Sequence, residues 1–556
     1  MLKYILLILF YFNSQTLFSC TTLLITKEAT TDGSTIVAHS DDDDLGDQRL
    51  VYVPAKSYPK GSKRAIYPAN VSTYPRYVGK DRGPAYNTSE YPFTKPLGYI
   101  DQVPHTYAYF DANYSVINEH QLAIGECTNS TYYYFDHSED RLLDISALSR
   151  IALERCKQAK EAVKLIGALA EKHGYYGWGE TLLLADPEEG WVFEISATPT
   201  GKSAVWVAKK VPEGEMFVAA NQFRIQNIDP KDPNTLFSSS LFKIAKENNW
   251  LDENENFDWQ KNLCPGEFDH PYYSLRRVWR VFSQVAPSKD LSPWVENAYT
   301  KEYPFSIKLD NKISVKDVFS LYRDHYEDTE FSLRKGLSSG PYGSPHRYLG
   351  NYDRCNFPNK RTTKPQGAWE RPISVYYCGF SYVAQLRKDL PDAIGGLVWF
   401  SFDAPYTTCY MPLYAGMTDL PKNFQYGNPL KFNKDFAWWA FNFTANWIAN
   451  KFDIAIKDLQ DKQQEYETEM LKQQQKIELK AIQYYKKNPS DAKKYLTQYC
   501  INNANDIVNK WWDLSTYLIE KYNTGFINKP KPSSIGYPLW WREDVGYDKG
   551  PVSYEK

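Results

Sequence analysis

Several features are scarce in this sequence, and each scarcity excludes a class of protein. Cysteine accounts for only 8 of 556 residues, which excludes a small domain held together by disulfides. Lys and Arg (65) nearly balance Asp and Glu (67), for a net charge of −2, so no basic excess indicates a nucleic-acid partner. Beyond the first twenty residues, no apolar run approaches the ~18–20 residues that a membrane span needs.

Motifs for metal and nucleotide binding are also missing. No His stands at zinc-site spacing from another His or Cys, and no Walker or Rossmann glycine pattern joins a strand to a helix. Residues 336–340 match G-x-S-x-G, but Pro341 and Gly343 follow where a nucleophile elbow needs a helix. The acidic run 41–44 is typical of a solvated turn. We therefore expect no cofactor and no metal.

Aromatic and apolar residues are abundant instead. Hydrophobic residues make up 42% of the chain and aromatic residues 16%, enough for a large core and incompatible with disorder. At roughly 100–200 residues per domain, the length allows two to four domains or one large one.

The first 19 residues have the layout of a secretory signal peptide, and we expect them to be removed. Lys3 precedes an apolar core at 4–12, and a polar stretch ends at Ser19. The predicted destination is the secretory pathway, either extracellular or lysosomal/vacuolar. Glycosylation is expected at N-x-[ST] sequons, which begin at Asn70, Asn87, Asn113, Asn129 and Asn442.

The pattern of strands and helices predicts an α+β layered enzyme with a main domain over 20–450. β-branched and aliphatic residues around a turn at 31–34 predict a hairpin that begins at Cys20. Helical periodicity predicts one amphipathic helix over 146–173. Further strands are expected at 181–185, 191–196 and 217–221.

From about residue 437 the pattern becomes helical. We expect residues 451–556 to form a helical region that packs on the main domain as a hairpin broken near Asn488 and Pro489. The heptad pattern in this region is too short and too polar for a coiled coil.

Cys20 would become the first residue of the mature chain. A cysteine there carries a thiol of pKa near 8.5 beside an α-amine of pKa roughly 7.7–8.0, and the amine can act as base for its own side chain. Two other interpretations stay open from position alone, a lipidated bacterial cysteine and a structural disulfide. The seven other cysteines are odd in number, so at least one thiol is free while some pairs can form disulfides.

Several motifs together resemble the dipeptidase A family of cysteine peptidases, which are similar to N-terminal nucleophile hydrolases such as bile salt hydrolase and penicillin V acylase. The motifs that carry this resemblance extend from residue 20 to about 450. They are CTT at 20–22, DGST at 32–35, AHSDD at 38–42, NEHQ at 118–121, GECT at 125–128, ANQF at 220–223, HPYYSLRR at 270–277 and AWERP at 368–372.

The resemblance implies an αββα four-layer sandwich and hydrolysis of dipeptides without a cofactor. Cys20 would attack the peptide carbonyl and form a thioester, which water then resolves. Asp42 matches the acidic residue that holds the N-terminal amine. Asn221 matches a residue of the oxyanion hole, where a fixed donor is worth ~2.7–4 kcal/mol.

The resemblance also implies that Arg276 or Arg277 lies near the nucleophile, with the register uncertain by one residue. Substrate contacts are expected from His39 and Thr128. His39 stands where bile salt hydrolase and many dipeptidases have Arg, and because His is not always charged, the resemblance leaves open how the thiolate is stabilised here.

Two other functions remain open at the level of sequence. One is an amidase or acyltransferase that acts on non-peptide amides with the same catalytic core. The other is a non-catalytic secreted protein whose aromatic residues line a carbohydrate or peptide groove. Dipeptides are the expected partners, with no nucleic acid and no membrane span, and homo-oligomerisation is left open.

Overall fold

The computed structural model describes residues 19–43, 46–252, 257–267, 272–295, 297–299, 303–348 and 369–550. The predicted signal peptide lies outside these residues, except for Ser19 at its end. Asp44, Cys355 and residues 268–271 also lie outside them.

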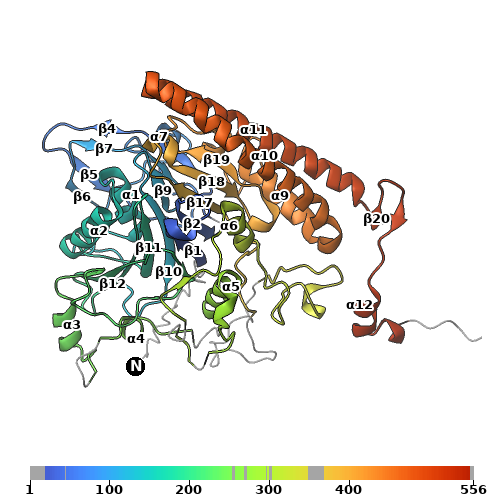
Figure 1. Cartoon of the computed structure of the whole chain (residues 1–556), viewed down its shortest axis with the longest axis horizontal. Helices are drawn as coiled ribbons and strands as arrows, with labels where there is room; N and C mark the ends of the chain where they lie inside the picture. The colour runs from blue at the N-terminus through green and yellow to red at the C-terminus, as the bar shows by residue number, and fades with distance from the viewer. Residues whose placement is uncertain are drawn as a thin grey trace, which may run out of the picture.

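A seven-stranded antiparallel sheet has the N-terminal hairpin near its centre (Figure 1). The predicted hairpin is confirmed, and Cys20 pairs with Asp41 across it while Ser19 pairs with Asp42. In sheet order the strands are β16 (Ser306–Lys308), β14 (Glu215–Ala219), β1 (Ser19–Ile25), β2 (Thr35–Asp42), β17 (Phe380–Leu386), β18 (Leu397–Phe402) and β19 (Met411–Tyr414).

An eight-stranded sheet faces the first one. Leu183 packs in the apolar cluster between the sheets, whereas Leu182 and Leu184 pack in a second cluster on the other face, so this strand is apolar on both sides. In sheet order the strands are β15 (Thr235–Phe237), β13 (Ala204–Lys210), β12 (Gly190–Ala197), β11 (Gly179–Ala185), β10 (Ala123–Asn129), β9 (Ser115–Asn118), β8 (Tyr109–Asp111) and β3 (Val51–Val53).

The two sheets approach each other closely behind the N-terminal hairpin. A Cβ on Gly125 of β10 would lie 2.4 Å from Thr22 Oγ1 and 3.0 Å from a methyl group of Val37. Only glycine therefore allows this separation. The close approach brings β10 directly against the start of β1.

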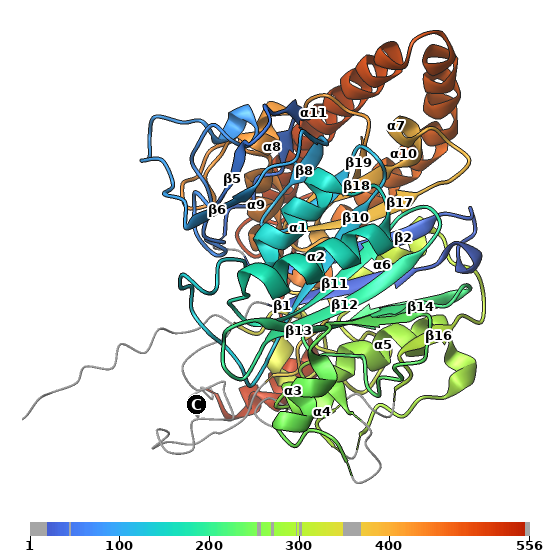
Figure 2. The same ribbon diagram turned by 90° about the vertical axis from the view of Figure 1, so that its left-hand side faces the viewer.

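Two helices cover the outer face of the eight-stranded sheet, α1 (Ile145–Arg155) and α2 (Ala159–His173) (Figure 2). The prediction of one continuous helix was wrong. In the middle of the predicted range, two side chains from distant parts of the chain form hydrogen bonds with backbone groups. Asn118 Nδ2 donates to the Cys156 carbonyl at 2.8 Å, and the Ala159 amide donates to Asp186 Oδ2 at 2.8 Å. These contacts end one helix and begin the next.

Other helices pack on the seven-stranded sheet, and the C-terminal region adds a long helical hairpin (Figure 1). Pro489 occupies the first turn of the second long helix, where its missing amide costs nothing. The helices are α5 (Leu275–Val285), α6 (Val315–Tyr322), α9 (Ala437–Ala449), α10 (Phe452–Lys487) and α11 (Pro489–Lys521), of which α11 runs along α9 and β19.

Shorter elements complete the described chain. They are α3 (Leu241–Glu247), α4 (Trp259–Leu263), α7 (Asp392–Gly395), α8 (Lys422–Gln425), α12 (Leu539–Asp544), and the strand pairs β4 (Lys56–Ser57) with β7 (His105–Thr106), β5 (Lys63–Ile66) with β6 (Gly98–Asp101), and β20 (Phe526–Ile527) with β21 (Ser533–Ser534).

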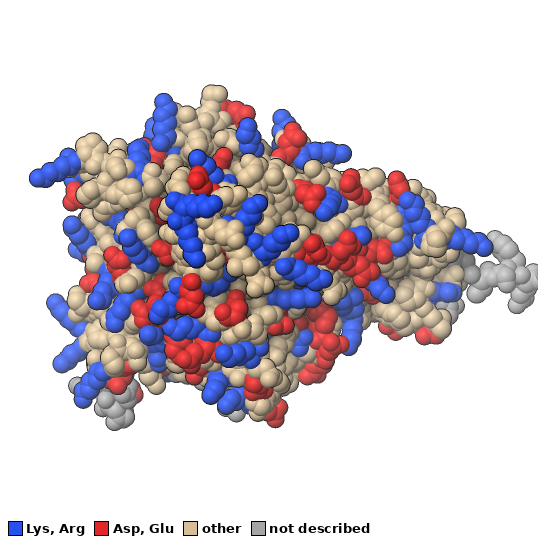
Figure 3. All heavy atoms as spheres, turned by 45° about the horizontal axis from the view of Figure 1, so that its top comes forward, with Lys and Arg blue, Asp and Glu red and all other residues tan. Residues whose placement is uncertain are grey.

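The mixture of helices and antiparallel sheets confirms the predicted α+β class. Within the described ranges, no helix has the length and apolar character needed to cross a membrane. On the face in Figure 3, Lys and Arg interleave with Asp and Glu.

Two sequence expectations need correction. The sequons at Asn113 and Asn129 are each only 1% exposed, because their side chains donate to Asp41 and Thr181 inside the protein. They are therefore inaccessible to glycosylation in the folded chain. All seven cysteines in the described part of the chain are free and buried, so no disulfide forms among them.

Candidate active site

Cys20 is the second residue of β1 and is buried, with 1% of its surface exposed. Its Sγ donates to Glu126 Oε2 on β10 at 3.4 Å. Burial, followed by the charges of Glu126 and Asp41, raises the pKa of this thiol well above its usual range. With Ser19 still attached, Cys20 is therefore protonated at neutral pH.

Arg277 is the candidate arginine that reaches Cys20. Its Nη1 donates to the Cys20 carbonyl at 2.8 Å and to Thr21 Oγ1 at 3.0 Å. Its Nη2 donates to Asn221 Oδ1 at 2.7 Å. One guanidinium thus joins β1 to the end of β14.

Arg276 points away from the nucleophile. Its guanidinium pairs with Glu370 at 3.0 Å and lies 3.5 Å from the ring centroid of Phe331. Successive residues of an α-helix differ by about 100° in direction, so α5 can present only one of its two adjacent arginines to β1. Of the two arginines, the structure therefore brings Arg277 and not Arg276 to Cys20.

Asn221 follows β14 in a left-handed backbone conformation, with φ of 67°. Asn tolerates this conformation better than most residues. Its amide donates to Cys127 Sγ at 2.8 Å, and its Nδ2 donates to the Thr128 carbonyl at 2.7 Å. Its Oδ1 accepts from both Arg277 and Arg371. These contacts hold the side chain in one orientation beside Arg277.

Asp42 lies at the end of β2 and forms a buried ion pair with Arg371. Burial raises the pKa of Asp42, and the charge of Arg371 opposes this shift. Ser40 Oγ also donates to Asp42 Oδ2, at 3.3 Å. The other carboxylate oxygen of Asp42, Oδ1, is buried without a hydrogen-bond partner among the described residues. Because Ser19 is the strand partner of Asp42, this carboxylate lies beside the N-terminal side of Cys20.

His39 and Thr128, the expected substrate contacts, are both buried near Glu126. His39 Nδ1 lies 2.8 Å from the Glu126 carbonyl, and because a carbonyl only accepts, this nitrogen carries the proton. Burial lowers the pKa of His39 to about 3, so the ring is neutral. Thr128 Oγ1 donates to Glu126 Oε1 at 2.9 Å.

The sequence did not single out Glu126, Glu180 or Arg371 as site residues. Burial raises the pKa of both glutamates, and their side chains contact each other by a hydrogen bond, as expected when two buried carboxyl groups share a proton. Glu126 and Arg371 do lie within the family-like motifs at 125–128 and 368–372. Their position within those motifs was the one sign in the sequence that they belong to the site.

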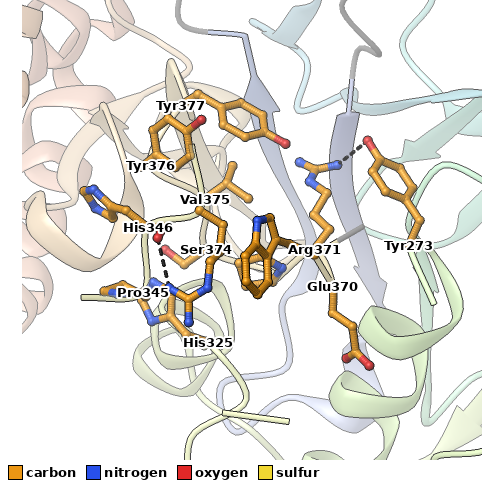
Figure 4. A pocket seen from close by; sticks show the side chains of 13 residues that line it. Tyr273, His325, Pro345, His346, Glu370, Arg371, Ser374, Val375, Tyr376 and Tyr377 are labelled. Atoms are coloured by element: carbon orange, nitrogen blue, oxygen red, sulfur yellow. Dashed lines mark hydrogen bonds between the residues drawn. The ribbon is translucent and has the colours of Figure 1, made fainter. Parts of the chain in front are cut away.

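A pocket lies next to this cluster (Figure 4). Arg371 lies between the pocket and the residues around Cys20, since it lines the pocket while its guanidinium contacts Asp42 and Asn221. Figure 4 shows Arg371 directed toward Tyr273, whose hydroxyl accepts from it at 3.1 Å. The lining is Tyr273, His325, Pro345, His346, Arg347, Trp369, Glu370, Arg371, Pro372, Ser374, Val375, Tyr376 and Tyr377. His39 and Thr128 are not part of it.

Comparisons with known proteins agree on one family. The profile of peptidase family C69 matches residues 19–465. A probable dipeptidase of Latilactobacillus sakei is 25% identical over 73% of this chain and 76% of its own. A probable dipeptidase of Salmonella dublin is 26% identical over 72% and 81%, and dipeptidase A of Lactobacillus helveticus is 23% identical over 77% and 81%.

Proposed function

Because the chain belongs to peptidase family C69, we propose that it is a cysteine-type dipeptidase whose nucleophile is the thiol of Cys20. The similar proteins named dipeptidases support the substrate class. The observation that carries the assignment of the nucleophile is the contact of Arg277 with the Cys20 carbonyl at the start of β1, where the same guanidinium also holds Asn221. The facing sheets with helices on either side are consistent with an αββα sandwich of the N-terminal nucleophile type.

Removal of the signal peptide in the secretory pathway is the first step of this proposal. Cleavage after Ser19 leaves a free α-amine on Cys20 next to Asp42. The unpartnered Asp42 Oδ1 is a suitable acceptor for that amine, since a buried carboxylate oxygen is costly to leave without a hydrogen bond. Asp42 would then orient the amine toward the Cys20 thiol.

The amine acts as the general base in the chemical step. It takes the proton from Cys20 Sγ, and the thiolate attacks the peptide carbonyl to form a tetrahedral intermediate. The protonated amine then gives its proton to the leaving amino group, which departs as a free amino acid and leaves a thioester. A water molecule, deprotonated by the same amine, hydrolyses the thioester and restores the thiol.

Asn221 and Arg277 stabilise the negative charge that develops on the carbonyl oxygen. Their positions are fixed before substrate binds, because each is held by several hydrogen bonds. Preorganised donors and charges of this kind cost no reorganisation during the reaction. Arg277 supplies positive charge at the start of β1, where His39 is neutral.

The pocket next to Arg371 is the proposed binding site for the dipeptide. A dipeptide is a zwitterion with charged groups at both ends, and the pocket contains charges of both signs in Glu370, Arg347 and Arg371. Its other walls are largely aromatic, which suits apolar substrate side chains.

The test compares N-terminal sequence with activity in one purified sample. A protein that begins at Cys20 should hydrolyse dipeptides, and Cys20→Ser should not. Faster turnover of acylated amines than of dipeptides would favour the amidase alternative. A protein that begins at Cys20 and hydrolyses neither class would refute the enzymatic proposal.

A further inference from the structure

Three side chains that can ligate metal converge between the two sheets. The potential ligand atoms of Cys20, His39 and Asp41 all lie within 4.8 Å of one another, and all three residues are buried. The strand register explains this convergence. Cys20 is paired with Asp41, and His39 is two residues earlier on the same face of β2.

His39 is prepared to act as a ligand. Its Nδ1–H is used by the Glu126 carbonyl, so its lone pair is on Nε2. That nitrogen is buried and has no hydrogen-bond partner among the described residues. A histidine that donates one ring N–H to a carbonyl and keeps the other nitrogen free has the usual arrangement of a metal-bound imidazole.

The surroundings of these ligands favour a cation. Glu126 Oε2 is 3.4 Å from Cys20 Sγ, and Asp41 is fixed by Asn113 Nδ2 at 2.9 Å. Carboxyl oxygens thus lie close to the Cys20 sulfur on both β2 and β10.

We propose that Cys20, His39 and Asp41 form an inhibitory binding site for a thiophilic divalent cation, with Zn²⁺ as the best match. One thiolate, one imidazole and one carboxylate are ordinary Zn²⁺ ligands at about 2.0–2.3 Å. Atoms bound tetrahedrally at those lengths are roughly 3.3–3.8 Å apart, so the side chains must close by about 1 Å.

Maturation supplies the fourth ligand. A free α-amine on Cys20 and its thiolate can bind one ion through a five-membered chelate ring, which completes a tetrahedral set with His39 and Asp41. Binding exchanges the thiol proton for the metal, and the proton is released to solvent. The nucleophile and its base are then both occupied, so hydrolysis stops.

Inhibition rests on the proposed function, whereas metal binding needs only a chain that begins at Cys20, and the experiment separates them. The protein beginning at Cys20 is titrated with Co²⁺, whose thiolate charge-transfer and ligand-field absorption reports binding to sulfur in tetrahedral geometry. Zn²⁺ then displaces the Co²⁺ and gives its affinity. Dipeptide turnover is measured in parallel over the same Zn²⁺ concentrations.

The expected result is a tetrahedral thiolate–Co²⁺ spectrum that is lost in Cys20→Ser. His39→Gln and Asp41→Asn should each weaken Zn²⁺ binding at least about tenfold. His325→Gln is the matched control, because His325 is also buried with an unpartnered Nε2 but is not among the three ligands. The His325→Gln variant should bind Zn²⁺ with unchanged affinity.

Two results would overturn the site. One is an absent or octahedral Co²⁺ spectrum in a protein that hydrolyses dipeptides, which leaves the dipeptidase proposal intact. The other is equal Zn²⁺ affinity in the wild-type, His39→Gln and Asp41→Asn proteins. If a variant does not fold, the wild-type protein is tested instead, by measuring whether Zn²⁺ slows alkylation of Cys20. Alkylation at the same rate with and without Zn²⁺ would reject the proposal.

Discussion

Retention of a single residue before Cys20 should abolish catalysis without disturbing the fold. In the structure Ser19 already continues β1 and pairs with Asp42, so a chain that begins at Ser19 should fold as described here. Its α-amine, however, is one residue away from the thiol, a displacement of about 3.8 Å between Cα atoms. The Cys20 nitrogen is then a peptide amide, which cannot act as a base.

The magnitude follows from the loss of that base. Positioned general-base catalysis contributes ~10²–10⁴-fold, equivalent to roughly 2.7–5.4 kcal/mol in the activation free energy. The raised pKa of the buried Cys20 thiol deepens the loss, because no solvent base reaches it. We therefore expect a fall in kcat/KM of at least about 10²-fold.

The assay compares two proteins produced separately, one beginning at Cys20 and the other at Ser19. Mass spectrometry establishes each N-terminus, and thermal unfolding checks that the two proteins are equally stable. Dipeptide turnover is then measured under the same conditions. Equal turnover by the two proteins would show that the α-amine of Cys20 is not the base, and the proposed mechanism would be refuted.

Three further predictions follow from named contacts. Cys20→Ser and thiol alkylation should each remove nearly all dipeptide turnover, whereas a chelator should not lower it; inactivation by the chelator alone would contradict a thiol mechanism. Arg277→Met should lower kcat/KM at least about 10²-fold, whereas Arg276→Met, its neighbour on α5, should affect mainly thermal stability, and equal kinetic losses would be evidence against the assigned geometry. Burial alone would raise the pKa of Asp47, but Arg49 and Arg76 hold it at about 2. Because this folded-state pKa is below the ordinary value of about 3.9, ionised Asp47 stabilises the folded protein fully above pH ~4, and this stabilisation is lost as the pH falls toward 2. In the Asp47→Asn variant, the free energy of unfolding measured with urea should change less between pH 4 and pH 2 than in the wild-type protein. An unchanged pH dependence would show that the ion pairs of Asp47 with Arg49 and Arg76 are not its cause.

Local patterns in the sequence were sufficient for the elements around Cys20. The β-branched run before and after the turn at 31–34 predicted the central hairpin, and its register alone brings Cys20 next to Asp41. The strands at 181–185 and 191–196 were also predictable from short apolar runs. They belong to β11 and β12, which the structure extends by one or two residues at their ends.

Features that depend on contacts between distant residues could not be predicted. The break between α1 and α2 is made by Asn118 and Asp186, which come from other parts of the chain. Arg371 reaches Asp42 and Asn221 across separations of 329 and 150 residues. No local periodicity encodes such contacts, and only the family-like motifs indicated that these segments matter.

The pairing of Ser19 with Asp42 also fixes the order of events during biosynthesis. In the folded chain the peptide bond between Ser19 and Cys20 is within an antiparallel ladder, and Cys20 is buried. A protease binds its substrate as an extended strand with free edges, so it can reach this bond only before β1 joins the sheet. Under the proposed maturation, the cut after Ser19 must therefore precede folding, and a chain that folds first would be kinetically trapped as an inactive precursor.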